Sequence, residues 1–167
     1  KKYVLVFISV LLLMPFLALA QADNAVESDK VTLEDLGVSD PGTLPTSPFY
    51  FLKSFARGIE RVITFNPVKR AELELRITNE KVAEIKKLEE TADEAGLIKA
   101  LENYEESAER LKTRFKALKE TSENPNIDKL LDKLTDRTLK HQQLFEELQA
   151  KHIELRDKID SAKEDLE

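Results

Sequence analysis

The stretch LIKALENYEESAERLKTRFKAL (residues 97–118) decides the fold, because its apolar residues return at alternating steps of four and three. This spacing places them along one side of a helix and is the heptad pattern of helices that pack as coiled coils. The members of this seam are Leu97, Leu101, Tyr104, Ala108, Leu111, Phe115 and Leu118. The pattern predicts a long helix with one buried face and an all-α fold class.

A second helix is predicted upstream, over residues 67–92. Asn66 is a suitable helix cap, and Pro67 fits the first helical position, where its missing N–H group is not needed. One stripe of this helix carries Val68, Ala71, Leu75, Thr78, Val82, Ile85 and Leu88. The sequence ADEAG then indicates a turn, with Gly96 in the left-handed conformation that often ends a helix.

Downstream of residue 118, SENPN (residues 122–126) interrupts the helical pattern, because Pro125 cannot continue a helix and Asn126 can cap a new one. The four-and-three spacing then resumes and runs to the end of the chain. Its members are Ile127, Leu131, Leu134, Thr138, His141, Phe145, Leu148, His152, Leu155, Ile159, Ala162 and Leu166. This predicts one last helix of about 60 Å, against about 40 Å for each of the two before it.

Short turns make these three helices antiparallel neighbours, so the last helix should overhang the bundle by roughly 14 residues. The apolar seam continues through this overhang as Leu155, Ile159, Ala162 and Leu166. We expect these four residues to bind a protein partner or a second copy of the chain. Two alternatives stay open: the helix bends near His152 and folds back, or the helix boundaries differ from those assumed.

A shorter amphipathic helix should precede the bundle. In LPTSPFYFLK (residues 44–53), Ser47 can cap and Pro48 can occupy the first position of a helix that reaches residue 65. Its apolar face carries Leu52, Phe55, Ile59, Val62 and Ile63, and a second face carries Lys53, Arg57 and Arg61.

Two interpretations of this helix remain open. In the first, the apolar face covers the open side of the bundle and the basic stripe faces water or the acidic helices. In the second, the helix lies in a membrane interface. The predicted membrane or partner surface then consists of Phe49, Tyr50, Lys53, Arg57 and Arg61.

The first twenty residues have the pattern of a signal peptide, with two lysines, an apolar run and a small-residue end at Ala18-Leu19-Ala20. Cleavage after Ala20 is expected, with Ala22 as the second choice, and an uncleaved signal anchor is the alternative. Either way, the remainder is predicted to be exported: extracellular, periplasmic, or membrane-anchored and facing outward.

Residues 21–46 are predicted to be an acidic flexible linker, whose Val31, Leu33, Leu36 and Val38 can dock locally. Residues 47–167 are predicted to form the helical bundle domain.

Composition argues against several functions. The net charge of −6 disfavours nucleic-acid binding, and the absence of cysteine excludes disulfides and thiolate metal sites. His141 and His152 lie about 16 Å apart along one helix, too far to share an ion. We therefore predict no metal and no cofactor. No nucleophile motif or phosphate loop is present, and we expect no enzymatic activity. A buried, neutral histidine at either position would make the apolar seam sensitive to acid.

Three pieces of the sequence together, LPTSPFYFLK, TFNPVKRAELEL and NEKVAEIKKLEE, resemble an uncharacterised family of exported bacterial and archaeal proteins. Members of that family show a Pro-x-Ser-Pro-(Phe/Leu)-Tyr-x-Leu-Lys opening. The resemblance covers residues 44–90 in detail, although Lys81-Val82 replaces a frequent Arg-Leu pair. It implies export and an α-helical domain, and it assigns no catalytic residue.

The sequence as a whole predicts a short amphipathic helix followed by an antiparallel three-helix bundle with coiled-coil packing and an overlong last helix. The expected function is that of an exported, non-enzymatic interaction or structural protein of the cell envelope. A peripheral membrane module that uses residues 48–65 is the alternative, and a pH- or metal-responsive binding protein is a more distant one.

Overall fold

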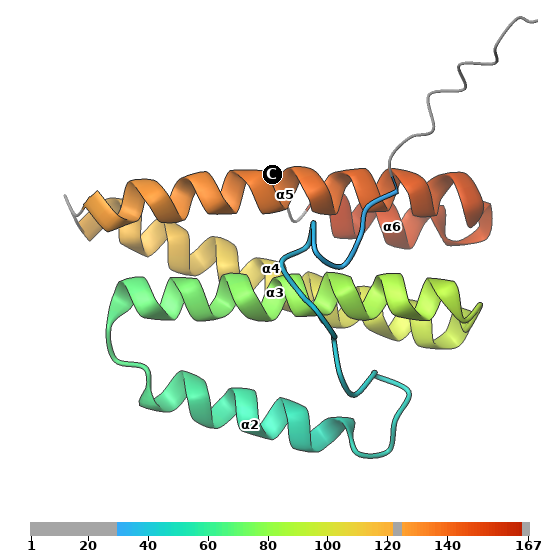
Figure 1. Ribbon diagram of the computed structural model, residues 1–167, viewed down its shortest axis with the longest axis horizontal. Helices are drawn as coiled ribbons and strands as arrows, with labels where there is room; N and C mark the ends of the chain where they lie inside the picture. Colours follow the sequence, from blue (N-terminus) through green and yellow to red (C-terminus); the bar gives the residue numbers. More distant parts are fainter. Residues whose placement is uncertain (1–29, 122–124, 165–167) are drawn as a thin grey trace, which may run out of the picture.

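The computed structural model describes residues 30–121 and 125–164, and this part of the chain is all-α, with no β-strand. The elements in chain order are α2 (Tyr50–Ile63), α3 (Pro67–Glu90), α4 (Glu94–Thr121), α5 (Pro125–Lys151), a short 3-10 turn η1 (Ile153–Leu155) and α6 (Arg156–Glu164). Helices α3, α4 and α5 alternate in direction, so that α4 is antiparallel to both α3 and α5, and α2 lies along α3 at the lower edge of Figure 1. The predicted fold class is confirmed.

The predicted seam of the central helix is confirmed residue by residue, because all seven of its members are buried in α4. They contribute to two apolar clusters. The larger cluster joins the second half of α3 to the first half of α4, the end of α5 and α6, and the smaller one joins the other ends of α3, α4 and α5. In the larger cluster the ring of Tyr104 meets that of Phe145 edge-on at a centroid distance of 5.0 Å, a preferred aromatic geometry.

The start of α3 follows the prediction. Asn66 Oδ1 accepts a hydrogen bond of 3.1 Å from the N–H of Lys69, and Pro67 is the first helical residue. The other starts differ slightly. Helix α2 begins at Tyr50, so Pro48 lies before it rather than in it. Helix α5 begins at Pro125, so Asn126 lies inside its first turn and not at the cap.

The turn between α3 and α4 corrects the prediction for Gly96. The left-handed residue is Ala92, with φ 53°. Its N–H donates to Glu89 O (3.1 Å) and the next N–H, of Asp93, to Leu88 O (3.4 Å), which is the double hydrogen bond of a Schellman motif. Gly96 lies within α4, where a side chain would displace its neighbours. A Cβ atom there would lie 2.6 Å from Thr46 Cγ2.

The segment before α2 packs on the bundle instead of forming a flexible linker over residues 30–46. Val31, Leu36 and Val38 belong to the larger apolar cluster, and each is less than a tenth exposed. The N–H of Val31 donates to Glu147 Oε1 on α5 at 3.0 Å. Figure 1 shows this segment crossing the face of the bundle on its way to α2. The local docking of its apolar residues is thus confirmed, and residues 30–46 pack on the bundle where the sequence predicted an acidic flexible linker.

The last helix does not continue straight to the end of the chain. Helix α5 ends at Lys151, His152 leaves helical geometry (φ −120°, ψ 74°), and η1 turns the chain so that α6 packs beside α4 and α5. Leu155, Ile159 and Ala162 enter the larger apolar cluster and are at most 5% exposed. The expected overhang is therefore wrong. The fold-back alternative holds instead, because it buries the seam without needing another chain.

Candidate interaction surface

The basic stripe of α2 points inward, onto α3. Lys53 Nζ contacts Glu84 Oε1 at 2.6 Å, and Arg57 Nη2 contacts Glu80 Oε2 at 2.5 Å. One turn further along α2, Arg61 binds Glu74 through two parallel hydrogen bonds of 2.8 and 2.9 Å. The residue numbers of the bases rise along α2 while those of their paired glutamates fall along α3, so the two helices are antiparallel. A row of ion pairs therefore joins α2 to α3.

Glu84 is the centre of this polar interface and has no exposed surface. Its Oε2 accepts a hydrogen bond of 2.6 Å from Tyr50 Oη, and Tyr50 Oη in turn accepts one from Lys81 Nζ. Burial and the neighbouring Glu84 raise the pKa of the Tyr50 hydroxyl. Burial also lowers the pKa of Lys81 to about 8, an effect that Glu84 partly offsets and that Arg57 and Lys53 strengthen.

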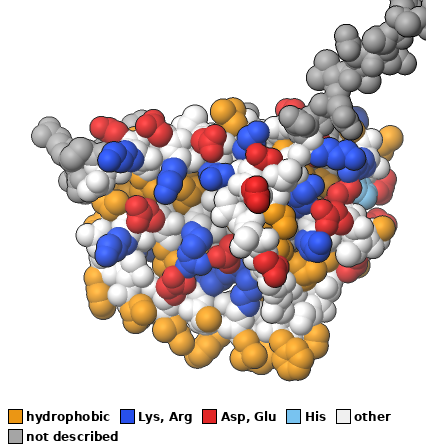
Figure 2. Space-filling model, in the orientation of Figure 1, with side chains coloured by type: hydrophobic (Ala, Val, Ile, Leu, Met, Phe, Trp, Pro, Cys, Tyr) orange, Lys and Arg blue, Asp and Glu red, His pale blue; other side chains and the backbone are white. Residues whose placement is uncertain are grey.

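The apolar face of α2 points outward, which is the reverse of its usual placement in a bundle. We name the exposed large apolar side chains on and beside α2 the α2 apolar face. They are 48–81% exposed and comprise Phe49, Phe51, Leu52, Phe55, Ile59, Val62, Ile63 and Phe65. Figure 2 shows hydrophobic side chains along the lower edge of the molecule, where α2 lies. The interpretation in which this face covers the bundle is therefore wrong. Its expectation that the basic stripe faces water or the acidic helices holds in the second form, because the stripe pairs with glutamates of α3.

The α2 apolar face is not flat. Phe55, Gly58, Ile59 and Val62 line a shallow groove of about 440 Å³. Gly58 forms its notch, and a Cβ atom there would meet nothing within 4 Å. A protruding phenylalanine ring and a notch thus lie one turn apart on the same face.

The structure separates the site residues predicted from sequence into two groups. Phe49 belongs to the outward face, whereas Tyr50 and Arg57 are buried against α3, and Lys53 and Arg61 pair there with glutamates. The predicted partner-binding residues Leu155, Ile159 and Ala162 pack inside the chain, and Leu166 lies outside the described residues. Their burial by α6 corrects the expectation that a bare seam seeks a partner.

Sequence reasoning missed the partners of the basic stripe. They are Glu74, Glu80 and Glu84, and two of them repeat the four-residue step of Lys53 and Arg57. This matched spacing on consecutive helices was the available signal. It was obscured because α3 carries many other charged residues.

The two histidines have different environments. His141 is buried, with Nε2 3.0 Å from Asn79 Oδ1 and Nδ1 3.3 Å from Tyr104 Oη. His152 lies at the break after α5, with Nδ1 3.3 Å from Glu154 Oε1. Within residues 30–121 and 125–164, no group of three His, Cys, Asp or Glu side chains is placed to hold a metal ion.

These features define a class: a small helical domain with a polar internal interface and one amphipathic helix whose apolar face is open. The chain belongs to a family described as a domain of unknown function (DUF5667), whose model matches residues 42–167. The match thus includes the LPTSPFYFLK motif from its first residue and all the described helices. No curated protein and no solved structure matches the chain.

The predicted signal peptide, residues 1–20, lies outside the described residues. In the part of the chain that the structure describes, no helix is long and apolar enough to cross a membrane.

Proposed function

We propose that this protein is an exported, non-enzymatic structural protein of the cell envelope that associates with a second copy of itself through the α2 apolar face. The observation that carries the proposal is the outward position of eight large apolar side chains on and beside one helix. Contiguous exposed apolar patches mark interaction sites. Each such side chain gains about 1.5–3 kcal/mol when it leaves water completely.

The size of the α2 apolar face fits a protein interface. An aromatic side chain buries about 150–250 Å² when fully enclosed. With roughly 100 Å² open on each of eight side chains, the face offers on the order of 800 Å², which is what each partner contributes to a standard interface. A second copy covers both faces in one contact, since an isologous pair uses the same patch twice.

The shape and charge of the face also favour a second copy. Phe55 and Gly58 line the same groove, so in an antiparallel pair of α2 helices we expect the Phe55 ring of each copy to pack against Gly58 of the other. The basic residues of α2 face α3 and are paired there. They are thus withdrawn from the outer surface, where a membrane-bound helix uses them to attract anionic lipids.

Sedimentation of residues 21–167 tests the proposal. We expect a concentration-dependent dimer, and we expect Phe55→Ser to weaken it by at least tenfold. The matched control is Leu139→Ser, which changes a side chain that is 60% exposed on α5 and should leave the dimer unchanged. A monomer at all concentrations up to the millimolar range contradicts self-association.

A membrane surface is the second candidate, favoured by the amphipathic character of α2 and its four exposed phenylalanines. Gly58→Leu separates the two candidates. The added side chain fills the notch, which weakens a packed dimer, yet it increases the apolar surface, which strengthens lipid binding. A monomer that floats with liposomes, and floats more strongly as Gly58→Leu, establishes the membrane function instead.

A further inference from the structure

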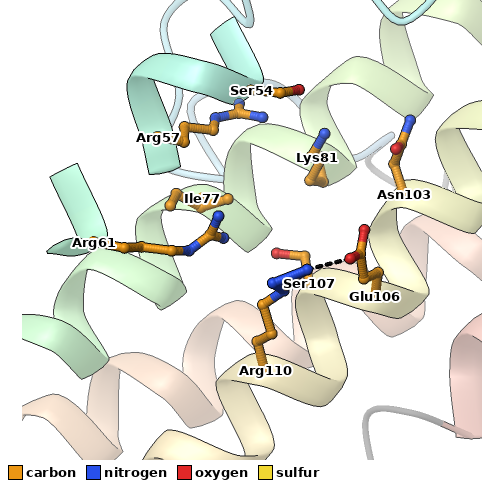
Figure 3. A pocket seen from close by; sticks show the side chains of 9 residues that line it. All are labelled: Ser54, Arg57, Arg61, Ile77, Lys81, Asn103, Glu106, Ser107 and Arg110. Atoms are coloured by element: carbon orange, nitrogen blue, oxygen red, sulfur yellow. Dashed lines mark hydrogen bonds and ion pairs between the residues drawn. The ribbon is translucent and has the colours of Figure 1, made fainter. Parts of the chain in front are cut away.

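A cavity of about 260 Å³ opens between α2, α3 and α4, behind the α2 apolar face. Figure 3 shows the side chains that reach into it from the three helices. Those that donate hydrogen bonds or carry positive charge include Ser54, Arg57, Arg61, Lys81, Asn103 and Arg110. Glu106 is its one acidic lining residue, and the carboxylate is engaged by Arg110. The cavity therefore presents mainly donors.

Some of these donors have no acceptor within the described protein. Arg57 is 5% exposed and uses Nη2 to bind Glu80 and Glu84, but its Nε and Nη1 are buried and unpaired. Asn103 Nδ2, which approaches from α4 on the other side of the cavity, is buried and unpaired as well. Buried donors without acceptors are rare in proteins, and each such group requires an explanation. An acceptor-rich ligand in the cavity supplies one.

The charges around the cavity are also unbalanced. The ion pairs between α2 and α3, taken together with those that Arg76 and Lys81 make within α3, join five bases to four carboxylates. The bases are Lys53, Arg57, Arg61, Arg76 and Lys81, and the acids are Glu60, Glu74, Glu80 and Glu84. Arg110 and Glu106 neutralise each other. One positive charge is left over in a partly desolvated site, where a single negative ligand would neutralise it.

We propose that this cavity binds a small oxyanion of the phosphate, sulfate or carboxylate class. Arg57 and Asn103 donate hydrogen bonds to it from opposite walls, Lys81 supplies the positive charge, and Arg110 offers the guanidinium N–H groups that Glu106 does not engage. A planar guanidinium and an amide N–H₂ group suit an oxyanion, which offers several acceptor oxygens at once. This site does not include the residues of the α2 apolar face, so its test is independent of the test of self-association.

Calorimetric titration of the full chain in a nonionic detergent at pH 7 tests the proposal, with sodium phosphate, sodium sulfate and sodium malonate as separate probes at constant ionic strength. We expect saturable binding at one site, for which the probes compete, and the tightest of them identifies the ligand class. Asn103→Asp places a carboxylate in the cavity and should lower the affinity at least tenfold. Arg110→Gln should lower it severalfold.

The chain offers a matched control on the same helix. Arg114 lies one turn beyond Arg110 on α4, is exposed, and does not line the cavity. Arg114→Gln removes the same charge from nearly the same place and should leave the affinity unchanged. An equal loss in Arg110→Gln and Arg114→Gln shows a general charge effect and overturns the site.

Proton uptake gives a second readout that a purely structural cluster would not show. The charged groups around Lys81 are Tyr50, Lys53 and Arg57 on α2, Glu84 on α3, and Glu106 and Arg110 on α4. A bound anion favours the charged form of Lys81, whose pKa is about 8. Binding at pH 8 should therefore take up a fraction of a proton, measured from the binding heats in two buffers of different ionisation enthalpy. Heats that do not saturate, or that sodium chloride reproduces, overturn the proposal.

Discussion

The hydroxyl of Tyr50 donates a 2.6 Å hydrogen bond to Glu84 Oε2, and this contact joins the first turn of α2 to the buried side of α3. The same carboxylate binds Lys53 at 2.6 Å and Arg57 at 3.3 Å. One acidic residue therefore holds the polar side of α2 against the bundle, and in doing so it directs the apolar side to solvent.

Removing this carboxylate should be costly. Glu84→Ala leaves Lys53, Arg57 and Lys81 in a buried site without their shared counter-ion, and breaking a buried ion pair in this way costs about 3–5 kcal/mol. We expect the free energy of unfolding in urea to fall by about 3 kcal/mol, since Arg57 keeps Glu80. Glu90→Gln, in an exposed pair with Lys87, should change it by less than about 1 kcal/mol. Equal effects of the two substitutions would show that Glu84 does not anchor α2.

Acid should destabilise the bundle through His141. Burial, with a contribution from the charge of Arg137, lowers the pKa of His141 to about 3, whereas an unfolded histidine has a pKa of about 6.5. The folded state therefore binds fewer protons, and stability is lost as the pH falls below 6.5. Between pH 7 and pH 5 the loss should be about 2 kcal/mol.

Other groups also titrate in this pH range, so the stability change of the wild type must be compared with that of a variant that lacks His141. Urea unfolding of the wild type and of His141→Gln at pH 7 and pH 5 isolates the contribution of the imidazole. The stability of the wild type should drop by about 2 kcal/mol more than that of the variant. Parallel losses in the two proteins would show that His141 is not held in its neutral form.

The fold-back of α6 predicts unequal roles for two nearby isoleucines. Ile159 has no exposed surface, whereas Ile153 is 70% exposed. Ile159→Ala should lower the free energy of unfolding by about 2–4 kcal/mol, because it leaves a cavity in the larger apolar cluster. Ile153→Ala should change it by less than about 0.5 kcal/mol. If the last helix were straight, the two substitutions would not differ in this way. Equal chemical denaturation curves for Ile159→Ala and Ile153→Ala would therefore contradict the fold-back.

The turn between α3 and α4 offers a stabilising substitution. Ala92 has φ 53°, a left-handed conformation that costs a residue with a Cβ atom about 1 kcal/mol relative to glycine. Ala92→Gly should raise the melting temperature, with a gain of roughly 0.5–1 kcal/mol. Ala95→Gly lies three residues away in the first turn of α4. It should lower the free energy of unfolding by roughly 0.5–1 kcal/mol and thus lower the melting temperature. A loss of stability in both variants would contradict the assigned turn geometry.

Local patterns accounted for the helices and most of their ends. The seam from Leu97 to Leu118 is buried throughout α4, and Asn66 caps α3 as expected, because these features depend on neighbours within a few residues. The break after α5 was harder to place. The four-and-three spacing continues across His152 without a proline or glycine, so only the gain from burying Leu155 and Ile159 inside the chain decides that the helix turns there.

The orientation of α2 also depended partly on the local sequence pattern and partly on the tertiary structure. By itself, the sequence determined that α2 has one basic face and one apolar face, since the spacing of Lys53, Arg57 and Arg61 requires it. Only the tertiary structure decided which face turns inward. Glu80 and Glu84 come into register with Arg57 and Lys53 when α3 lies antiparallel to α2. A pattern along one helix cannot specify the position of charges on another.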